Sequence, residues 1–383
     1  MREAAAAGQD QGVSPQPRAP KPNLAPVPPR WLVTAVLQLR RGLVRLADAL
    51  VPPQLPLLER IVGAGFTVVI GELARLGIAD RLADAPKTAG ELAKETGANV
   101  DALRRTLRCG VSIGLFTLDS GGRFAGTRLA EGLRSGDGSL RDFARYFASE
   151  SNVRAWLDYP RVLETGKNGF ERVHGASVWE WFDRHPIERD AFAAGMASGT
   201  RQEAPAIAKA FPFGEVKRLC DVGGGSGTLL GHVLLAWPHL EGVLLDGPGV
   251  LSQARDRFAA YGVADRARLV PGSFFEAVPP GCDAYMMKNI LHDWDDARSL
   301  HILGKVRAAM QPGQRLLICE GLIDDPHTDG VTLADLQMMV VCSDGRERTR
   351  AEYEALLQQS GFRRGRVLPT AYPTTWVIEA LAV

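Results

Sequence analysis

The sequence predicts an α/β protein: a Rossmann-like, doubly wound and mostly parallel sheet, preceded by a helical winged-helix domain. From Val216 to the C-terminus, short apolar segments alternate with amphipathic ones. This alternation is typical of strands whose crossover helices cover both faces of one sheet. A glycine-rich turn, DVGGGSG at 221–227, follows the first apolar segment. The second segment, EGVLLD, ends in the carboxylate of Asp246.

Charge and cysteine content exclude several classes of protein. The 383 residues include 45 Lys and Arg against 44 Asp and Glu, so the net charge does not favour nucleic acid or an anionic membrane as a partner. The five cysteines are scattered and form no C-x-x-C pair, which argues against a disulfide framework or a zinc site. We expect buried thiols in a reducing, cytoplasmic environment. We find no signal peptide and no apolar run of about 18 residues.

The N-terminal 50 residues divide into two segments of different character. Residues 1–30 are rich in Ala, Pro, Gln and Gly, so we expect a disordered leader that buries too little apolar surface to offset its ordering entropy. Residues 31–50 have the pattern of an amphipathic helix, which Pro52 and Pro53 terminate. The apolar stripe of this helix needs a partner. A second copy of the chain is the simplest one and predicts a homodimer, with a membrane-surface role as the alternative.

Residues 31–140 are expected to form the winged-helix domain. Thr88, with Glu91 three residues later, predicts a capping box. Asn99 stands where it would cap the next helix, and Ser-Gly-Gly at 120–122 predicts a hairpin turn. Winged helices bind DNA or only pack against protein, and the missing basic excess favours packing and dimerisation here. The expected elements are helices at 57–78, 88–97 and 99–116 and a hairpin at 116–127.

The segment 141–212 is helical in pattern and rich in aromatic residues. An aromatic helical block beside a ligand-binding domain often lines an apolar pocket. We therefore expect this segment to link the two domains and to supply walls of the substrate site. Its candidate substrate contacts are Phe147, Trp156 and Met196, and the expected substrate is a small, flat, hydroxylated aromatic molecule.

Residues 213–383 carry the predicted sheet and are expected to form the catalytic, cofactor-binding domain. Because ligands bind at the carboxyl ends of parallel strands, the polar residues that follow each apolar segment are the candidate site residues. Expected strands lie at 218–222, 243–246, 267–275, 283–291, 315–323 and 374–383, and expected helices at 228–237, 249–262, 296–310 and 350–362.

The glycine turn and Asp246 together predict a nucleoside-containing cofactor. Glycine lets the backbone approach a ligand where a Cβ would collide, which suits Gly223 and Gly225. A carboxylate about 20 residues further on is placed for two vicinal ribose hydroxyls. The dinucleotide fingerprint is incomplete, because Thr228 stands at its third glycine. Asp221 would repel a pyrophosphate but favours the ammonium of an amino-acid group, which points to S-adenosylmethionine.

His292, in KNILHDWDD, is the candidate general base. An imidazole titrates near neutral pH, and this one follows a predicted strand, unlike the other histidines. A carboxylate on the far ring nitrogen would fix the tautomer and stabilise the protonated ring. Glu320, at the end of another predicted strand, and Glu347 are the candidates for that carboxylate. Asp293 follows the histidine directly.

Several blocks of this sequence together resemble a known enzyme family. The blocks are DVGGGSG, LLD, PGSFFE, MMKNILHDWDD, LLICEGLI and GRERTRAEYEALLQQSGF. They look like those of the metal-independent, S-adenosylmethionine-dependent O-methyltransferases, which include plant caffeate-type enzymes and bacterial enzymes that tailor polyketides and phenazines. The resemblance covers about residues 55–383. It implies a class I methyltransferase fold with a dimerising winged-helix domain.

The resemblance also implies roles for individual residues. The implied base is His292, flanked by Glu320 and Glu347. The implied cofactor contacts are Asp246 to the ribose, Gly223 and Gly225 near the methionine moiety, and Lys288 near the adenosine. Ser273 stands where the family often has an adenine-binding Asp, and Phe274 replaces a frequent Met and would stack on the adenine. Substrate contacts are expected from Asp293, Met339 and Cys342, with no metal ion.

The expected reaction is methyl transfer to a phenolic or enolic hydroxyl of an aromatic or polyketide-like molecule. A phenol has a pKa of about 10, so a base with a pKa of about 7 lowers the barrier usefully. The alternative is an enzyme of this fold that binds the cofactor but hydroxylates, decarboxylates or guides a pericyclic reaction. The presence of His292 with both glutamates favours methyl transfer. A composition high in Ala, Arg and Gly resembles that of a GC-rich bacterium and fits secondary metabolism, such as antibiotic biosynthesis.

Overall fold

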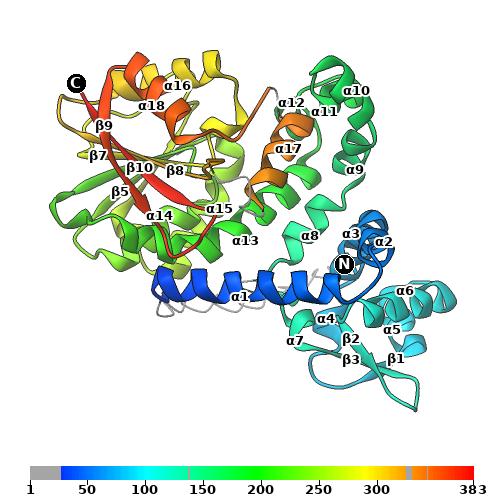
Figure 1. Ribbon diagram of the computed structural model, residues 1–383. Coiled ribbons are helices and arrows are strands. Elements are labelled where there is room, and N and C mark those ends of the chain that lie inside the picture. Colours follow the sequence, from blue (N-terminus) through cyan, green and yellow to red (C-terminus); the bar gives the residue numbers. More distant parts are fainter. Residues whose placement is uncertain (1–26, 137–138, 325–329, 343) are drawn as a thin grey trace, which may run out of the picture.

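The computed structural model describes residues 27–136, 139–324, 330–342 and 344–383. Nearly all of the predicted leader at 1–30 therefore lies outside the described residues. The chain forms a large α/β body, a helical segment beside it and a small N-terminal domain below (Figure 1). No helix within the described ranges is both long and apolar enough to cross a membrane.

A seven-stranded sheet forms the centre of the α/β body, in the order β6-β5-β4-β7-β8-β10-β9. β4 to β8 are parallel, whereas β10 pairs antiparallel with β8 and β9. The predicted mostly parallel sheet is thus confirmed. The strand order reverses at β4, and ligands bind at such switch points. The strands are β4 Arg218–Val222, β5 Glu241–Asp246, β6 Ala267–Pro271, β7 Ala284–Lys288, β8 Arg315–Glu320, β9 Phe362–Pro369 and β10 Trp376–Ala382.

Helices cover both faces of this sheet. They are α13 Pro186–Ala210, α14 Thr228–Ala236, α15 Pro248–Tyr261, α16 Asp296–Ala309 and α18 Arg350–Gln359. Successive strand residues point to opposite faces, so Leu219 joins the core beneath α13, α14 and α15. Its neighbour Cys220 joins the core beneath α16 and α18. Because β4 to β8 run parallel, their carboxyl ends share one edge of the sheet.

Two elements of this body are not predicted from the sequence. β9 is an edge strand whose exposed positions include Arg363, Arg364 and Arg366, so its apolar content is too low to predict a strand. The helix α17, Val331–Val341, is apolar around most of its circumference. It therefore lacks the 3.6-residue alternation by which amphipathic helices are predicted.

The predicted single helix at 57–78 is wrong, because three helices occupy this part: α2 Gln54–Ile61, α3 Gly63–Arg75 and α4 Ile78–Arg81. Gly77 ends α3 with a φ of +61°, a left-handed conformation that glycine adopts without strain. Gly63 stands at the junction of α2 and α3, where its low helix propensity favours a break.

The rest of the small domain follows the predicted pattern. Its elements are β1 Lys87–Thr88, α5 Ala89–Thr96, α6 Val100–Ser112, β2 Phe116–Leu118, β3 Arg123–Gly126 and α7 Arg128–Glu131. The capping box of Thr88 and Glu91 is present, and the Asn99 side chain accepts hydrogen bonds from two amides of α6. Gly122 turns the hairpin with a φ of +75°. β1, β3 and β2 form the three-stranded sheet of the wing.

A helical segment connects the two parts of the molecule. It comprises α8 Arg141–Phe147, α9 Glu150–Leu157, α10 Tyr159–Thr165, α11 Gly169–His174 and α12 Val178–Arg184, followed by α13. α13 contacts both α8 and α14, and α17 contacts α9, α10 and α11. The aromatic segment therefore lies beside the loops that follow β7 and β8 (Figure 1).

The first helix, α1 Arg30–Ala49, runs along the base of the α/β body (Figure 1). It ends before Pro52 and Pro53, as predicted. None of its residues is buried. Arg30 fixes its start, because Nη1 donates to the carbonyl of Thr370 at 2.7 Å and the guanidinium lies 4.4 Å from the ring centroid of Trp376.

Candidate active site

The glycine turn between β4 and α14 has the geometry that a closely bound ligand requires. Gly223 and Gly225 have φ values of +72° and +56°, which strongly favour glycine. A Cβ on Gly223 would lie 2.5 Å from Cδ1 of Ile290, whereas a Cβ on Gly225 would meet no atom within 4 Å. Gly223 is thus needed for packing, and Gly225 borders open space where a ligand could lie.

Asp246 ends β5 opposite this turn. Its Oδ2 accepts a hydrogen bond from the amide of Gly225 at 2.7 Å, and its Oδ1 accepts one from Gly247 at 2.6 Å. Burial raises the pKa of this carboxyl, and the two amide bonds oppose that shift. The carboxylate therefore stands at the edge of the sheet beside the open turn.

Asp221, near the end of β4, is buried, with 1% of its surface exposed. Burial and the charge of Asp246 raise its pKa to about 7, and Lys288 opposes the shift. Its Oδ2 is buried and finds no hydrogen-bond partner among the described residues. Such an oxygen is costly to leave unpaired, and a ligand ammonium would satisfy it. The residues present therefore fit the amino-acid end of S-adenosylmethionine.

The remaining predicted cofactor residues lie around the same turn. Lys288 ends β7, and its Nζ lies 2.9 Å from Oε2 of Glu203 in α13, with both side chains largely buried. Phe274 lies beside the glycine turn, because its Cε1 would be 3.2 Å from a Cβ on Gly223. The hydroxyl of Ser273 accepts from the amide of Phe275 at 3.2 Å. Ser273 thus closes a local turn in this structure.

His292 lies in a short 3-10 turn, Leu291–Asp293, after β7. Asn289 redirects the chain there with a φ of +53°, a conformation that asparagine tolerates better than most residues. Nδ1 of His292 lies 2.8 Å from Oε1 of Glu347, and Nε2 lies 3.6 Å from Oδ1 of Asp293. A carboxylate only accepts hydrogen bonds, so Nδ1 carries the proton. Nε2 is then the basic nitrogen of the neutral ring.

The second predicted glutamate has other partners. Oε1 of Glu320 accepts from the amides of Ile290 at 3.0 Å and Leu291 at 2.8 Å. Its Oε2 accepts from the hydroxyl of Tyr353 in α18. Glu320 therefore holds the backbone that leads into the turn, and the hydrogen bond to the imidazole comes from Glu347.

Three carboxylates set the protonation of His292. Burial lowers the pKa of the imidazole, but Glu347 and Asp293, with a smaller contribution from Glu320, raise it to about 10. Burial raises the pKa of Asp293 to about 6, against the effect of His292. The three carboxylates thus favour the imidazolium form, and a cation bound nearby would lower the pKa of the ring.

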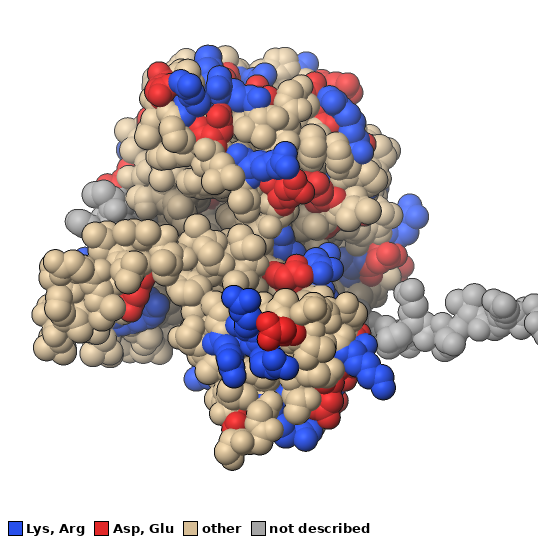
Figure 2. All heavy atoms as spheres, turned by 90° about the vertical axis from the view of Figure 1, so that its right-hand side faces the viewer, with Lys and Arg blue, Asp and Glu red and all other residues tan. Residues whose placement is uncertain are grey.

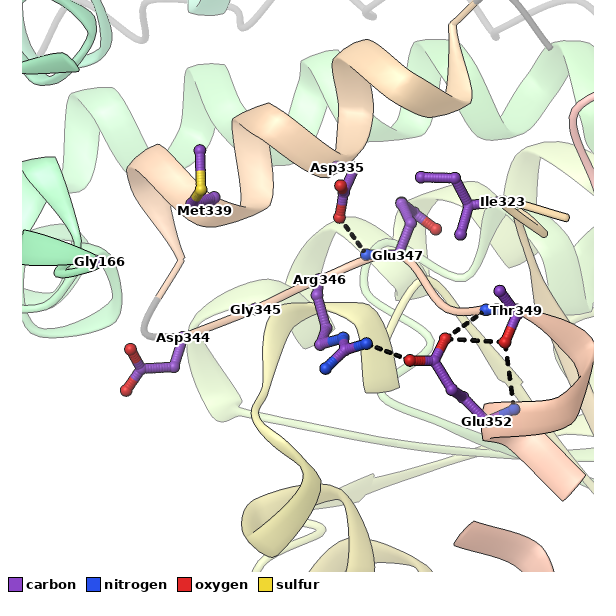
Figure 3. Close-up of a pocket in the computed structure, with 10 residues that line it drawn as sticks. All are labelled: Gly166, Ile323, Asp335, Met339, Asp344, Gly345, Arg346, Glu347, Thr349 and Glu352. Atoms are coloured by element: carbon purple, nitrogen blue, oxygen red, sulfur yellow. Dashed lines mark hydrogen bonds and ion pairs between the residues drawn. The ribbon is translucent and has the colours of Figure 1, made fainter. Parts of the chain in front are cut away.

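The loop that carries Glu347 borders a cavity of about 480 Å³ (Figure 3). Asp335 of α17 accepts from the amide of Glu347 at 2.9 Å, as the dashed line in Figure 3 shows. Arg346 donates its amide to the carbonyl of His292 at 2.8 Å. Met339, a predicted substrate residue, also lines this cavity. The loop is therefore fixed to α17 on one side and to the His292 turn on the other.

The other predicted substrate residues lie in two groups. Sγ of Cys342 donates to Oδ1 of Asp293 at 3.5 Å, which brings this thiol beside the His292 turn. Phe147, Trp156 and Met196 form the second group, and all three are partly buried against a core cluster that includes Tyr146 and Phe170.

Sequence reasoning missed several polar residues near these groups. Nε1 of Trp156 donates to Gln337 at 2.7 Å, and Gln337 donates to Asn152 at 2.7 Å. Glu203 is another missed residue, because a single Glu within a helical pattern carries no signal of a partner on a distant strand. Within the described parts of the chain, no three His, Cys, Asp or Glu residues are grouped so that they could hold a metal ion.

Comparisons with known proteins define the family. Residues 156–363 match the model of an O-methyltransferase domain, and residues 58–135 match that of an O-methyltransferase dimerisation domain. The phenazine O-methyltransferase PhzM of Lysobacter antibioticus is 40% identical over 84% of this chain and 94% of its own. The 8-amino-8-demethylriboflavin N,N-dimethyltransferase of Streptomyces davaonensis is 35% identical over 77% and 86%.

A solved structure is similar in fold as well as in sequence. An O-methyltransferase from neocarzinostatin biosynthesis, in complex with S-adenosylmethionine and 2-hydroxy-5-methyl naphthoic acid, superposes with a TM-score of 0.72. It is 30% identical, and the match covers 83% of this chain and 96% of that one. Fold and site thus define a class I methyltransferase that uses S-adenosylmethionine. The chain belongs to the O-methyltransferase family with an N-terminal dimerisation domain.

Proposed function

We propose that this enzyme transfers a methyl group to a phenolic or enolic hydroxyl of a flat aromatic natural product, with His292 as the general base. The observation that carries the proposal is the 2.8 Å contact between Nδ1 of His292 and Glu347, at the carboxyl edge of the sheet. The relatives support the substrate class, because their names refer to phenazine and naphthoic acid compounds. Nitrogen is the alternative acceptor, because one relative is an N,N-dimethyltransferase.

The residues around the glycine turn would bind and orient the cofactor. The unpaired oxygen of Asp221 would accept a hydrogen bond from the ammonium, and Asp246 would bind the ribose hydroxyls. Lys288 and Phe274 would contact the adenosine. Bound S-adenosylmethionine supplies an electrophilic methyl group on a positively charged sulfur. A positive charge bound near the imidazole would lower the pKa of His292 from its raised value of about 10 and favour the neutral ring, whose Nε2 can accept a proton.

His292 would then accept the hydroxyl proton at Nε2 while Glu347 holds Nδ1–H and stabilises the imidazolium that forms. The walls around Phe147, Trp156 and Met196 would hold an aromatic ring flat against the methyl group. Such orientation matters because in-line displacement needs the two reacting atoms close and aligned. Asp293, Met339 and Cys342 would line the same pocket. No step in this scheme requires a metal ion.

We also propose that the enzyme is a homodimer that does not bind nucleic acid. Large apolar side chains of α1 and α2 are exposed, among them Trp31 at 71% and Leu39 at 64%. Figure 2 shows a broad face with few charged side chains. Monomers rarely expose so much apolar surface, and the match of residues 58–135 to a dimerisation domain supports a second copy of the chain as the partner. In the recognition-type helix α6, Arg104 pairs with Asp101, and the whole chain carries a net charge of only +1, which does not favour nucleic acid.

Calorimetric titration with S-adenosylhomocysteine tests the cofactor site. We expect micromolar binding by the wild type and a loss of at least tenfold in Asp246→Ala, because the ribose hydroxyls lose their acceptor. Labelled methyl transfer to 2-hydroxy-5-methyl naphthoic acid and to hydroxylated phenazines then tests the acceptor. Binding that persists unchanged in Asp246→Ala would contradict the assigned site.

A further inference from the structure

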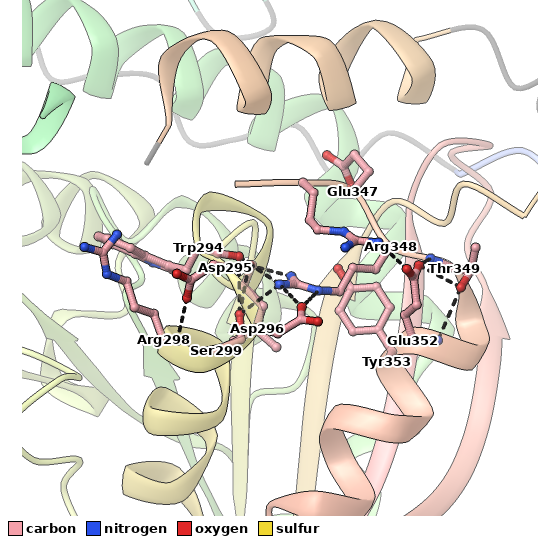
Figure 4. Close-up of polar contacts among 12 residues, drawn as sticks. Trp294, Asp295, Asp296, Arg298, Ser299, Glu347, Arg348, Thr349, Glu352 and Tyr353 are labelled. Carbon is pink, nitrogen blue, oxygen red and sulfur yellow. Dashed lines mark hydrogen bonds and ion pairs between the residues drawn. The ribbon is translucent and has the colours of Figure 1, made fainter. Parts of the chain in front are cut away.

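Arg348 is the largest of the fully buried side chains, with 0% of its surface exposed, and its guanidinium reaches the turn that carries His292. Nη1 donates to the carbonyl of Leu291 at 2.8 Å, and Nη2 donates to the carbonyl of Trp294 at 2.8 Å. These two carbonyls lie on either side of His292 and Asp293. The guanidinium therefore bridges the two ends of the turn, and Figure 4 shows Arg348 reaching toward Trp294, Asp296 and Ser299.

The charge of Arg348 is balanced by one acidic partner. Nε and Nη2 donate to Oδ1 of Asp296 at 3.0 and 2.8 Å. The Asp296 side chain is 59% exposed, so solvent weakens its attraction for the guanidinium. Burying a charge is costly unless it is well paired, and this pair alone offsets the cost only in part. The buried position of the guanidinium allows it to form its hydrogen bonds to the backbone of the turn.

The segment that carries Arg348 also carries Glu347. Side chains of adjacent residues in an extended segment point to opposite sides, and Leu322 pairs with Arg348 in a short bridge. Glu347 bonds the imidazole and Arg348 bonds the backbone of the turn, and Figure 4 shows the two side chains pointing to different sides of their segment. One rigid segment thus fixes both the ring nitrogen of His292 and the main chain on which the ring is mounted.

We propose that Arg348 is a positioning residue that sets the distance between His292 and Glu347. It touches neither the substrate nor the cofactor and acts through the turn at 291–294. The inference rests on the proposed role of His292 as the base. The planar guanidinium has five donors in a fixed fork, which here serve two carbonyls, one carboxylate and Ser299. A lysine would keep the charge but reach fewer of them.

The test is the pKa of His292, measured by NMR on histidine-labelled protein saturated with S-adenosylhomocysteine and assigned with His292→Ala. Arg348→Lys keeps the charge, so a change in this pKa reports geometry. We expect it to fall by about one unit or more, because a longer distance to Glu347 weakens the interaction that raises it. Glu347→Gln is the positive control and should lower the same pKa.

Arg307→Lys is the matched control for a purely structural arginine. Nε and Nη1 of Arg307 donate to the carbonyls of Gly361 and Met310, both at 3.1 Å, at the end of α16 opposite to the turn. It should lower thermal stability and leave the pKa of His292 unchanged. Asp296→Asn, which weakens the same clamp from an exposed position, should move that pKa in the direction of Arg348→Lys if the lysine variant does not fold.

Two failures are distinguishable. Folded variants Arg348→Lys or Asp296→Asn in which the pKa of His292 equals that of the wild type would overturn the positioning role. Full methyl transfer by His292→Ala would instead remove the proposed base, whatever Arg348 does. Affinity for S-adenosylhomocysteine should stay within about twofold of the wild type in Arg348→Lys, because Arg348 does not touch the cofactor residues.

Discussion

The two glutamates near His292 have different partners, and we expect them to act on the ring in different ways. Glu347 bonds the imidazole at 2.8 Å, so its charge acts on the proton affinity of the ring. Glu320 bonds the amides of Ile290 and Leu291, so it acts on the position of the turn. Removing Glu320 would leave two buried amides without an acceptor, which costs about 1–3 kcal/mol for each buried group left unpaired.

Asp221 leads to a prediction about proton release. In the cofactor-free protein its pKa is raised to about 7, so below that pH the carboxyl is protonated. A bound ammonium favours the carboxylate and lowers this pKa, so binding must release a proton. Affinity for S-adenosylhomocysteine should therefore weaken as the pH falls below 7, by up to about tenfold per unit.

Calorimetry in buffers of different ionisation enthalpy measures this release directly. Asp221→Asn should abolish the release near pH 7 and weaken binding, whereas the exposed control Asp265→Asn should change neither. Equal proton release by the wild type and Asp221→Asn would assign the titrating group elsewhere.

At the scale of single elements, the strand-turn-helix unit β4-turn-α14 is the most constrained part of the site. Gly223→Ala should lower the free energy of unfolding by about 1–3 kcal/mol, because its φ is positive and the new Cβ would collide with Ile290. The same substitution should weaken binding of S-adenosylhomocysteine. Gly214→Ala is the control, since nothing lies within 4 Å of its Cβ position. Urea unfolding of both variants measures the difference, and equal stabilities would contradict the packing role of Gly223.

Some of these elements could be predicted from the sequence and others could not. The strands β4 to β8 were predictable because each is a short apolar run followed by a polar residue. The caps at Thr88 and Asn99 were predictable because capping chemistry is local. The break between α2 and α3 was not, since glycine lowers helix propensity without fixing where a helix ends. β9 was not predicted because its arginines lower its apolar content. They are tolerated because β9 lies at the exposed edge of the sheet, which the sequence of the segment alone does not show.

Among the candidate site residues, too, some can be predicted from local sequence and others only from the tertiary structure. His292 and Glu347 were identifiable from family-like blocks, but which glutamate bonds the imidazole depends on tertiary geometry. The contacts of Glu203 with Lys288 and of Asp335 with the amide of Glu347 join residues 85 and 12 positions apart. No local pattern records such pairs. They can be found only once the helices are placed against the sheet.

At the scale of the whole molecule, the apolar face of α1 predicts self-association. Leu39 and Leu43 are 64% and 57% exposed and lie four residues apart on one helix face. The double variant Leu39→Asp, Leu43→Asp should convert the dimer into a monomer in sedimentation velocity at micromolar concentration. Leu163→Asp, at an equally exposed leucine of α10, should leave the dimer intact. A wild-type protein that sediments as a monomer would contradict the proposed homodimer.

In the proposed reaction, His292, held by Glu347, removes the acceptor proton in a methyl transfer from S-adenosylmethionine. The most direct test is labelled methyl transfer by the wild type and by His292→Ala, with one hydroxylated aromatic acceptor that the wild type accepts. We predict a loss of about 10²- to 10⁴-fold in turnover with unchanged affinity for S-adenosylhomocysteine, as expected for removal of a general base. Full turnover by His292→Ala would contradict the claim.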